Sequence, residues 1–481
     1  MPRLLKKSLI VLPIVIAVVV AAALGLYWPV LQFARGWGEP VLYPVTDLPS
    51  TRRTESIAII GGTLVDGTGG PPLENSVVLI QGERIAAVGR VNDLKIPPDS
   101  WKVQAAGKSI LPGLIDMHVH LSKGDDLHLF LAAGVTTVRD VGNFTAWVTP
   151  LEAGTRSNKI LGPRIFFSGE SFVHESGFAG WQRPTKDAGE ARAKVRERIS
   201  HGASVIKIVA DITPDLVEAI VDEAHREKVP VTADILGNNL VTADRAIRLG
   251  VDGLEHVSGV PQSIRQDGSP ADTSEPVSYN AMFGWLYPDQ KKEQALIVSI
   301  VEHRTYIVPT FVVLENQSGV PSPRDPATKF LSKRASRLWT AMNRLPDFGS
   351  STSAMAFFAQ FAYSQPFVSK VAAAGGRIVA GTDTPTPGLV PGFSLHRELE
   401  LLVQAGLSPM QAIQAATKTA AQFLGKADQI GTLEPGKFAD LIIVDGAPQR
   451  NITDIRKVHT VLKGGVVFDS SELSRLSEST K

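Results

Sequence analysis

The chain contains no cysteine among its 481 residues. Disulfide bonds, thiolate metal ligands and cysteine nucleophiles are therefore all excluded. Any metal site in this protein must use nitrogen and oxygen ligands. The missing cysteines do not fix the compartment, because exported proteins can fold without disulfides.

An excess of charge of either sign is missing as well. The chain carries 49 Lys and Arg against 48 Asp and Glu, a formal net charge of +1, and the two signs are interspersed. The basic patch that typifies nucleic-acid binding is absent, so we expect no nucleic-acid partner. The length predicts two or three domains and allows a large hydrophobic core.

The N-terminus does have a long hydrophobic run. Basic residues precede an uncharged apolar stretch from about Leu9 to Leu31. This stretch is long enough for a membrane-spanning helix, and the basic residues favour a cytoplasmic N-terminus. Ala21 and Ala23 would alternatively suit a signal-peptidase site. We predict a membrane-anchored protein whose body lies outside the cytoplasm (periplasmic or extracellular), or a cleaved secreted form.

The remainder is organised as two sets of short strands around a long middle section. The strand sets are rich in β-branched residues and turns, which is typical of antiparallel sheet. Between them apolar strands alternate with helical stretches, for example 205–209 followed by 214–227, which indicates parallel βα units. We predict an α/β fold: a (β/α)8 TIM-type barrel with a small β-sandwich domain built from both ends of the body, plus an N-terminal transmembrane or signal helix.

The predicted boundaries follow these changes of pattern. The segments are an anchor or signal segment at 1–33, a linker at 34–54, the first part of the β-sandwich at 55–112, the barrel at 113–431, the second part of the β-sandwich at 432–470 and a polar tail at 471–481. Two stretches, Pro261–Gln290 and Val320–Ser364, are long for barrel connections. Loops that follow barrel strands surround the active site, so we expect these stretches to form a lid or substrate wall. Surface insertions without a role in the site are the alternative.

His118 and His120 stand two residues apart in an apolar run that reads as a strand. Side chains at i and i+2 on a strand point to the same face, so both imidazoles converge. Two converging imidazoles make half of a divalent-metal site. Taken alone, the pair could equally be two structural histidines.

Lys207 lies in the middle of another apolar strand, 205–209. Burial of a lysine costs free energy and depresses its pKa, and a neutral amine can add carbon dioxide to become a carbamate, an anionic oxygen ligand. A snorkelling or salt-bridged lysine is the structural alternative.

His256 and Asp383 each end a short apolar strand. Beside a His-x-His strand, His256 becomes a third imidazole. A carboxylate at the end of a late barrel strand, such as Asp383, can bind metal and transfer protons. A structural histidine and a helix N-cap are the corresponding alternatives.

Together these residues resemble the amidohydrolase superfamily, and more closely its imidazolonepropionase-like branch with the prolidase-like dipeptidases. The resemblance extends from about Ile57 to Asp469. The motifs that carry it are 61–69 (GGTLVDGTG), 111–120 (LPGLIDMHVH), 134–140 (GVTTVRD), 380–383 (AGTD) and 431–441 (GTLEPGKFADL).

The resemblance implies a two-metal site. His118, His120 and Asp383 would hold the first metal, and Lys207 as a carbamate would bridge to a second metal that His256 helps to hold. The chain departs from the family pattern at the fifth strand, where Asp234 stands in the position of a histidine ligand. A carboxylate can bind a divalent ion, so the number of metals, one or two, stays open. We expect zinc. By family analogy, His174 would contact the substrate.

The function that the resemblance implies is hydrolysis of an amide (C–N, peptide-like) bond. A metal-activated hydroxide would attack and Asp383 would be the proton shuttle. Rival interpretations are hydrolysis of a cyclic amide or an ester-like bond, or a catalytically degenerate barrel that serves as a membrane-tethered binding protein. The expected partners are a small-molecule or short peptide substrate and, through the N-terminal segment, the membrane. Homo-oligomer formation is left open.

Overall fold

The structure of the protein, a computed structural model, describes most of the body after the N-terminal segment. The described residues are 51–121, 126–174, 181–236, 238, 240–267, 283–320, 325–331 and 351–479. The predicted anchor or signal segment and nearly all of the predicted linker lie outside them. Among the helices of the described residues, none combines the length and the apolarity that crossing a bilayer requires.

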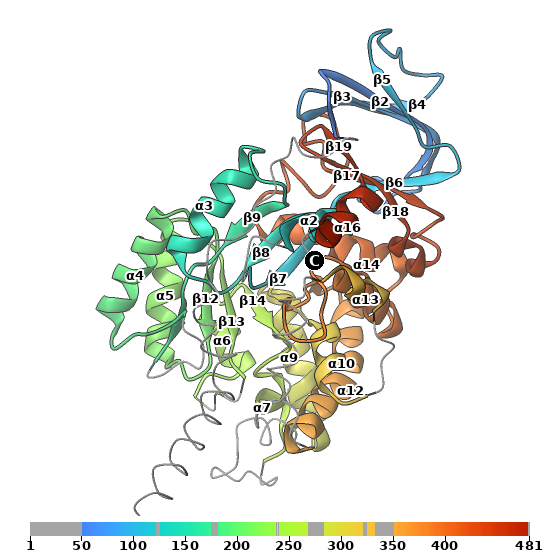
Figure 1. Ribbon diagram of the computed structural model, residues 1–481. Coiled ribbons are helices and arrows are strands. Elements are labelled where there is room, and N and C mark those ends of the chain that lie inside the picture. Colours follow the sequence, from blue (N-terminus) through green and yellow to red (C-terminus); the bar gives the residue numbers. More distant parts are fainter. Residues whose placement is uncertain are drawn as a thin grey trace, which may run out of the picture.

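Strands from both ends of the body join in one sheet, the curved blue and red layer at the top of Figure 1. Its order is β1-β19-β18-β17-β6-β2-β3-β4, and β5 pairs with β2. The strands are β1 (Arg52–Arg53), β2 (Ser56–Leu64), β3 (Leu73–Gln81), β4 (Arg84–Arg90), β5 (Trp101–Gln104), β6 (Lys108–Pro112), β17 (Leu441–Asp445), β18 (Val458–Lys463) and β19 (Val466–Asp469). Ile57 and Ile59 on β2 share one buried core with Leu441 and Ile443 on β17, so the sheet encloses its own apolar cluster.

Within the described residues, eight parallel strands form the barrel. They are β7 (Leu114–Val119), β8 (Val135–Asp140), β9 (Arg164–Phe167), β12 (Ile206–Val209), β13 (Val231–Asp234), β14 (Gly253–Glu255), β15 (Tyr306–Val308) and β16 (Arg377–Ile378). Hydrogen bonds between ladders close the ring: Ser204 N donates to Phe167 O at 2.9 Å, and Met117 N donates to Ala380 O at 3.0 Å. Two short strands, β10 (Ser171–Val173) and β11 (Gln182–Pro184), extend the sheet beside β12. The predicted TIM-type barrel is confirmed.

Helices follow the barrel strands and cover the outside of the ring (Figure 1). They are α2 (Leu127–Ala132), α3 (Thr145–Arg156), α4 (Ala188–Ser200), α5 (Pro214–Arg226), α6 (Ala243–Arg248), α7 (Val260–Ile264), α9 (Gln290–Glu302), α10 (Phe311–Gln317), α12 (Ser351–Ala373), α13 (Phe393–Gln404), α14 (Pro409–Ala415) and α15 (Lys418–Phe423), with 3-10 turns η3 (Pro326–Phe330) and η4 (Ile452–Arg456).

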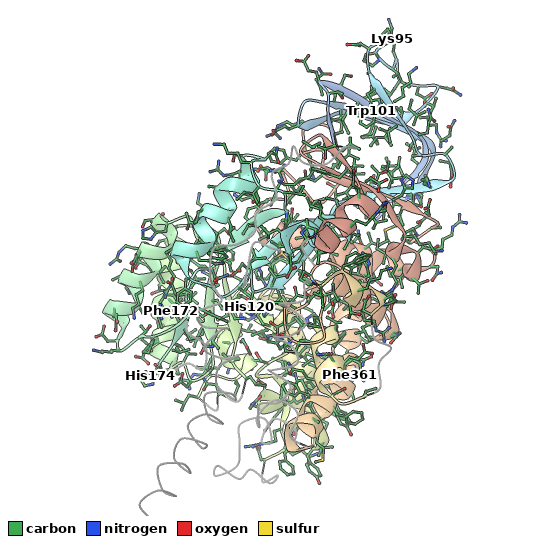
Figure 2. The ribbon with its side chains drawn as sticks, viewed as in Figure 1. Lys95, Trp101, His120, Phe172, His174 and Phe361 are labelled. Atoms are coloured by element: carbon green, nitrogen blue, oxygen red, sulfur yellow. The ribbon has the colours of Figure 1, made fainter. Side chains whose placement is uncertain are left out.

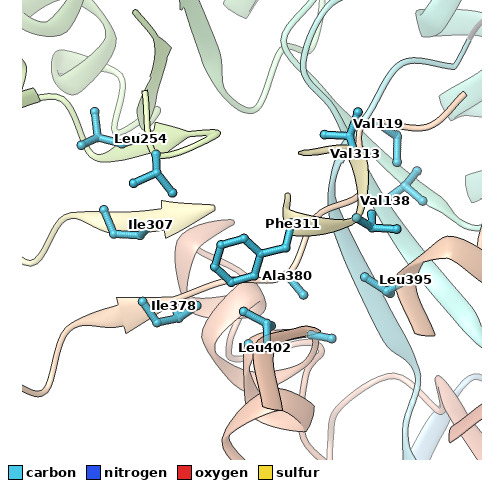
Figure 3. Close-up of a cluster of buried hydrophobic side chains, with 14 of the residues drawn as sticks. Val119, Val138, Leu254, Ile307, Phe311, Val313, Ile378, Ala380, Leu395 and Leu402 are labelled. Carbon is cyan, nitrogen blue, oxygen red and sulfur yellow. The ribbon is translucent and has the colours of Figure 1, made fainter. Parts of the chain in front are cut away.

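The core between strands and helices follows the alternation of the strands. Leu254, Ile307 and Ile378 come from three adjacent strands and lie near Phe311 at the start of α10 (Figure 3). The neighbours of Leu254 on β14 face the other way, into the barrel. This alternation leaves the inward positions at the carboxyl ends of the strands for polar side chains.

The segment predicted as a polar tail, 471–481, is largely helical. Helix α16 (Ser470–Ser479) places Leu473 in the main core, with Leu476 packed against it, and contacts α2. The spacing of these two leucines, i and i+3, puts them on one helix face. The tail is therefore part of the packed body up to this point.

Strand β7 contains an irregularity that bears on the site. The pairing register with β8 shifts between Asp116 and Val119, which marks an extra residue in β7. The segment that follows β16 then passes very close to this strand: a Cβ atom at Gly381 would lie 2.8 Å from His118 Cβ. Glycine at 381 thus allows the chain carrying Asp383 to lie against the chain carrying His118.

Candidate metal centre

The two histidines of the His-x-His motif lie side by side at the end of β7. Their ring centroids are 5.3 Å apart, and the His256 ring lies 4.5 Å from that of His118. His118 is 1% exposed, whereas a quarter of the His120 side chain is accessible. Figure 2 labels His120 near the centre of the barrel. The third imidazole predicted from the sequence therefore does join the pair.

Each of these three imidazoles uses its Nδ1 atom to donate to an oxygen. His118 donates to Glu255 Oε2 at 2.8 Å, and His120 donates to Gly142 O at 2.9 Å. His256 donates to Thr310 Oγ1 at 2.6 Å, and the Thr310 hydroxyl in turn donates to Pro309 O. With the proton on Nδ1, the lone pair of every Nε2 is left for a metal.

Asp383 lies where these Nε2 atoms converge. Its Oδ1 is 3.4 Å from His118 Nε2 and 3.2 Å from His120 Nε2. Ligand atoms of His118, His256 and Asp383 all lie within 4.8 Å of one another. Burial raises the pKa of Asp383, but the three imidazoles outweigh it and hold that pKa well below its usual range. The residue is therefore a carboxylate at neutral pH.

The charge on the histidines differs with their surroundings. Burial, together with the Lys207 amine, lowers the pKa of His118 to about 3, so this imidazole is neutral as a ligand must be. Burial is the largest effect on His120 and lowers its pKa, but Asp383, Asp140 and the hydrogen bond to Gly142 O together outweigh it, and the net shift is upward. A divalent cation bound between Asp383 and His120 would take the place of the proton that this upward shift favours on His120 Nε2.

Lys207 is 3% exposed in the middle of β12. Among the described residues, its Nζ atom has no hydrogen-bond or ion-pair partner. Burial lowers the pKa of this amine, and the carboxylates of Glu255 and Asp234 offset only part of that effect. Burial of an amine in this way disfavours its charged form.

Asp234 ends β13, and its Oδ2 lies 3.7 Å from His256 Nε2. The residue that departs from the family pattern thus faces the same centre as the other candidates. His118, His120 and Asp383 form a first donor group around the Asp383 carboxylate, and His256 and Asp234 form a second. The two groups are not separate, because the ligand atom of His256 also lies within 4.8 Å of those of His118 and Asp383. Neutral imidazole nitrogens and carboxylate oxygens with fixed orientations fit one or two divalent ions.

His174 lies further out, at the end of β10. Its backbone N–H donates to Asp211 Oδ1 at 3.2 Å, and Figure 2 shows it below and to one side of His120. The structure does not join it to the metal-ligand cluster within the described residues. Its assignment as a substrate contact stays a prediction.

Glu255 contacts the candidate site and was not predicted from the sequence. Its fully buried carboxylate accepts hydrogen bonds from His118, Thr232 and Arg139, the last at 2.5 Å. Burial raises the pKa of Glu255, but Arg139, Lys207 and His118 together hold it well below its usual range. An acidic residue inside an apolar strand, directly before His256, was the available signal.

Trp181 was also missed. Its ring centroid lies 5.7 Å from that of His120. A Cβ atom at Gly142 would lie 2.8 Å from Trp181 Nε1 and 3.0 Å from His120 Cε1, so the indole, the glycine and the imidazole pack together. Trp181 is an apolar wall beside the accessible edge of the site.

We expect Glu255→Gln to disrupt the first donor group. His118 and Arg139 both donate to Glu255, but a glutamine has only one carbonyl oxygen, and its NH2 group must face one of these donors. When the carbonyl oxygen accepts from Arg139, the NH2 group faces His118 Nδ1. His118 would then move its proton to Nε2, and zinc affinity should fall about 10- to 100-fold. Loss of the counter-ion of buried Arg139 should also lower the free energy of unfolding by about 3–5 kcal/mol.

A chromogenic chelator competing for zinc, and urea unfolding, measure the two effects. Glu152→Gln is the matched control, because Glu152 pairs with Arg156 on the surface of α3 and should change stability by less than about 0.5 kcal/mol. Zinc affinity in Glu255→Gln equal to that of the control would show that Glu255 does not orient His118.

Comparison with known proteins identifies the family. The Amidohydrolase family matches residues 109–468. Ochratoxinase from Aspergillus niger is 24% identical over 495 residues, which cover 88% of each chain. Enamidase from Eubacterium barkeri is 23% identical over 401 residues, covering 78% of this chain and 82% of the relative.

A solved structure shares the fold. A Xaa-Pro dipeptidase with methionine bound in its active site superposes with a TM-score of 0.65 at 22% identity, covering 86% of this chain and all of that one. The family match spans most of the chain and includes all the proposed ligands. The protein is a hydrolase of amide carbon–nitrogen bonds, and the chain belongs to the amidohydrolase family.

Proposed function

We propose that the protein hydrolyses the amide bond of a small or peptide-like substrate at a divalent-metal centre, with Asp383 as the group that transfers protons. The observation that carries the proposal is the gathering of the His118, His120 and His256 imidazoles around the Asp383 carboxylate, with each Nδ1 atom donating to an oxygen. The arrangement supplies both the ligands and the means of keeping them in the ligating tautomer.

A divalent metal bound here would lower the pKa of a water molecule and polarise the scissile carbonyl. Asp383 is ionised at neutral pH, so its carboxylate can accept the proton of the attacking water as the new C–O bond forms. The same carboxyl group then delivers that proton to the leaving nitrogen as the C–N bond breaks. His120 donates through Nδ1 to Gly142 O, which holds the adjoining edge of the site in place.

For the metal we propose zinc, with Lys207 as a carbamate that contributes an anionic oxygen. The partnerless buried amine supports the carbamate, and the nitrogen-rich first donor group supports zinc. Asp234 and His256 would hold a second ion with a larger share of oxygen ligands. His174 would contact the substrate from the end of β10.

The substrate class is proposed from the chemistry of the relatives. Ochratoxinase, enamidase and Xaa-Pro dipeptidase are names of enzymes that act on carbon–nitrogen bonds. Trp181, beside His120, favours an apolar group near the scissile bond. A linear amide is the proposal, and cleavage of cyclic amides or esters instead would favour the rival interpretation.

We also propose that the body acts outside the cytoplasm. Basic residues followed by an uncharged apolar run from about Leu9 to Leu31 support export. Cell fractionation with N-terminal sequencing tests this. An intact N-terminus in the membrane fraction indicates an anchor, a new N-terminus near residue 24 indicates cleavage, and a cytoplasmic protein contradicts export.

We expect Asp383→Asn to abolish turnover. An amide cannot accept the proton of the attacking water, and loss of a positioned proton-transfer group costs about 10²–10⁴-fold in rate. The assay is hydrolysis of N-acyl amino acids and dipeptides by the purified protein, with metal content measured in parallel. Asp222→Asn on the exposed face of α5 is the control and should retain full activity. A wild-type protein without bound metal and without metal-stimulated hydrolysis of this panel would contradict the proposed function.

We expect Lys207→Ala to lose both activity and metal, because the bridging oxygen disappears. A short carboxylic acid such as acetate should restore part of the activity by occupying the vacated space. Lys457→Ala, at a lysine whose side chain is 59% exposed, is the control. Full activity of Lys207→Ala without added acid would exclude the carbamate.

A further inference from the structure

The turn that follows β14 has a backbone conformation that its residues rarely adopt. His256 and Val257 have φ angles of 57° and 54°, both in the left-handed region. For a β-branched residue such as Val257 this conformation is a genuine outlier. Strained backbone of this kind persists only where the surrounding contacts over-determine it. Something must therefore hold this turn.

Gln360 provides the holding contacts. Its Nε2 donates to His256 O at 2.7 Å and to Val257 O at 3.4 Å. The side chain comes from α12, and the residue is only 5% exposed. One amide thus binds both carbonyl groups of the strained pair.

The orientation of the Gln360 amide is itself fixed. Its Oε1 accepts from Trp285 Nε1 at 2.5 Å. An indole N–H can only donate and a carbonyl oxygen can only accept, so the amide has one orientation that satisfies all its partners. Trp285 is 4% exposed and packs edge-on against Phe367 of α12, with ring centroids 6.0 Å apart.

This turn directs the His256 imidazole towards the metal centre. The His256 ring lies 4.5 Å from the His118 ring, with Nδ1 on Thr310 and Nε2 towards Asp234. A change of φ at residue 256 to the usual negative range would turn the Cα–Cβ bond of His256 in a different direction and carry Nε2 away from the other ligands. Among the described residues, the hydrogen bonds of Gln360 go to the two carbonyl groups of this turn and to Trp285 and none goes to a ligand side chain, so Gln360 acts through the backbone.

We propose that Gln360 is a positioning residue that clamps the left-handed turn at 256–257 and thereby holds His256 in its ligating position. With Trp285, it connects the stretches inserted after β14 and β15 to the metal centre. Helix α12 packs against α9 and α10 (Figure 1). Figure 2 labels Phe361, the residue that follows Gln360 on this helix. The inference rests on the proposed metal-dependent function.

The test uses the full chain with three variants. Gln360→Glu keeps the acceptor for Trp285 but presents an oxygen to the two carbonyls. Gln360→Leu keeps the approximate volume and removes all three hydrogen bonds. Trp285→Phe keeps the ring and frees the amide to rotate. Gln365→Leu is the matched control, because Gln365 is a half-buried glutamine of the same helix that bonds only to Phe361 O of its own turn.

Zinc affinity by chelator competition, the unfolding midpoint of the metal-free protein, and kcat and KM are the readouts. We expect zinc to bind about 10- to 100-fold more weakly in both Gln360 variants, with a smaller loss in Trp285→Phe. The loss in turnover should appear mainly in kcat. Gln365→Leu should match the wild type.

A purely structural role would lower the unfolding midpoint and leave zinc affinity unchanged in the folded variants. That result in Gln360→Glu or Trp285→Phe would overturn the inference, even if Gln360→Leu did not fold. Failure of the wild type itself to bind zinc or hydrolyse amides would instead contradict the proposed function.

Discussion

The carboxylate of Glu255 is the point on which the metal centre depends. It is fully buried, and burial of a charge is costly unless the charge is paired and hydrogen-bonded. Arg139 supplies the opposite charge, Thr232 a hydroxyl and His118 an imidazole N–H. These partners come from β8, β13 and β7, so one carboxylate connects three barrel strands below the site. Without the Glu255 carboxylate, the buried Arg139 cation would lose its ion-pair partner, and His118 would lose the acceptor that fixes its tautomer.

An oxygen acceptor fixes the Nδ1 proton of the other two histidines as well. Gly142 O holds His120, and Thr310 Oγ1 holds His256. A parallel barrel makes this possible, because the carboxyl ends of all its strands meet at one face. The cost is strained backbone at that face: His256, Val257, Thr310 and Asp383 all have positive φ. The helices and inserted stretches outside the ring then serve to hold these turns.

The sequence revealed the ligands more readily than their supports. His118 and His120 are visible because a period of two places them together, and Lys207 is visible because an amine stands among apolar residues. The terminal strands and the barrel were visible through the same periodicities. Glu255 offered the same kind of local signal, a charge in an apolar strand, but not the identity of its partners, and Gln360 offered no signal, because no local pattern encodes a contact across more than a hundred residues. Asp234 was recognised only as a departure, and its distance from His256 shows that it faces the site.

The central claim is that His118, His120 and Asp383 hold a metal ion. Anomalous diffraction from crystals of the zinc-loaded protein, recorded on both sides of the zinc absorption edge, tests it most directly. We expect an anomalous peak bounded by His118 Nε2, His120 Nε2 and the Asp383 carboxylate, with a second peak near His256 and Asp234 if two ions bind. The absence of any zinc peak among His118, His120 and Asp383 would contradict the claim.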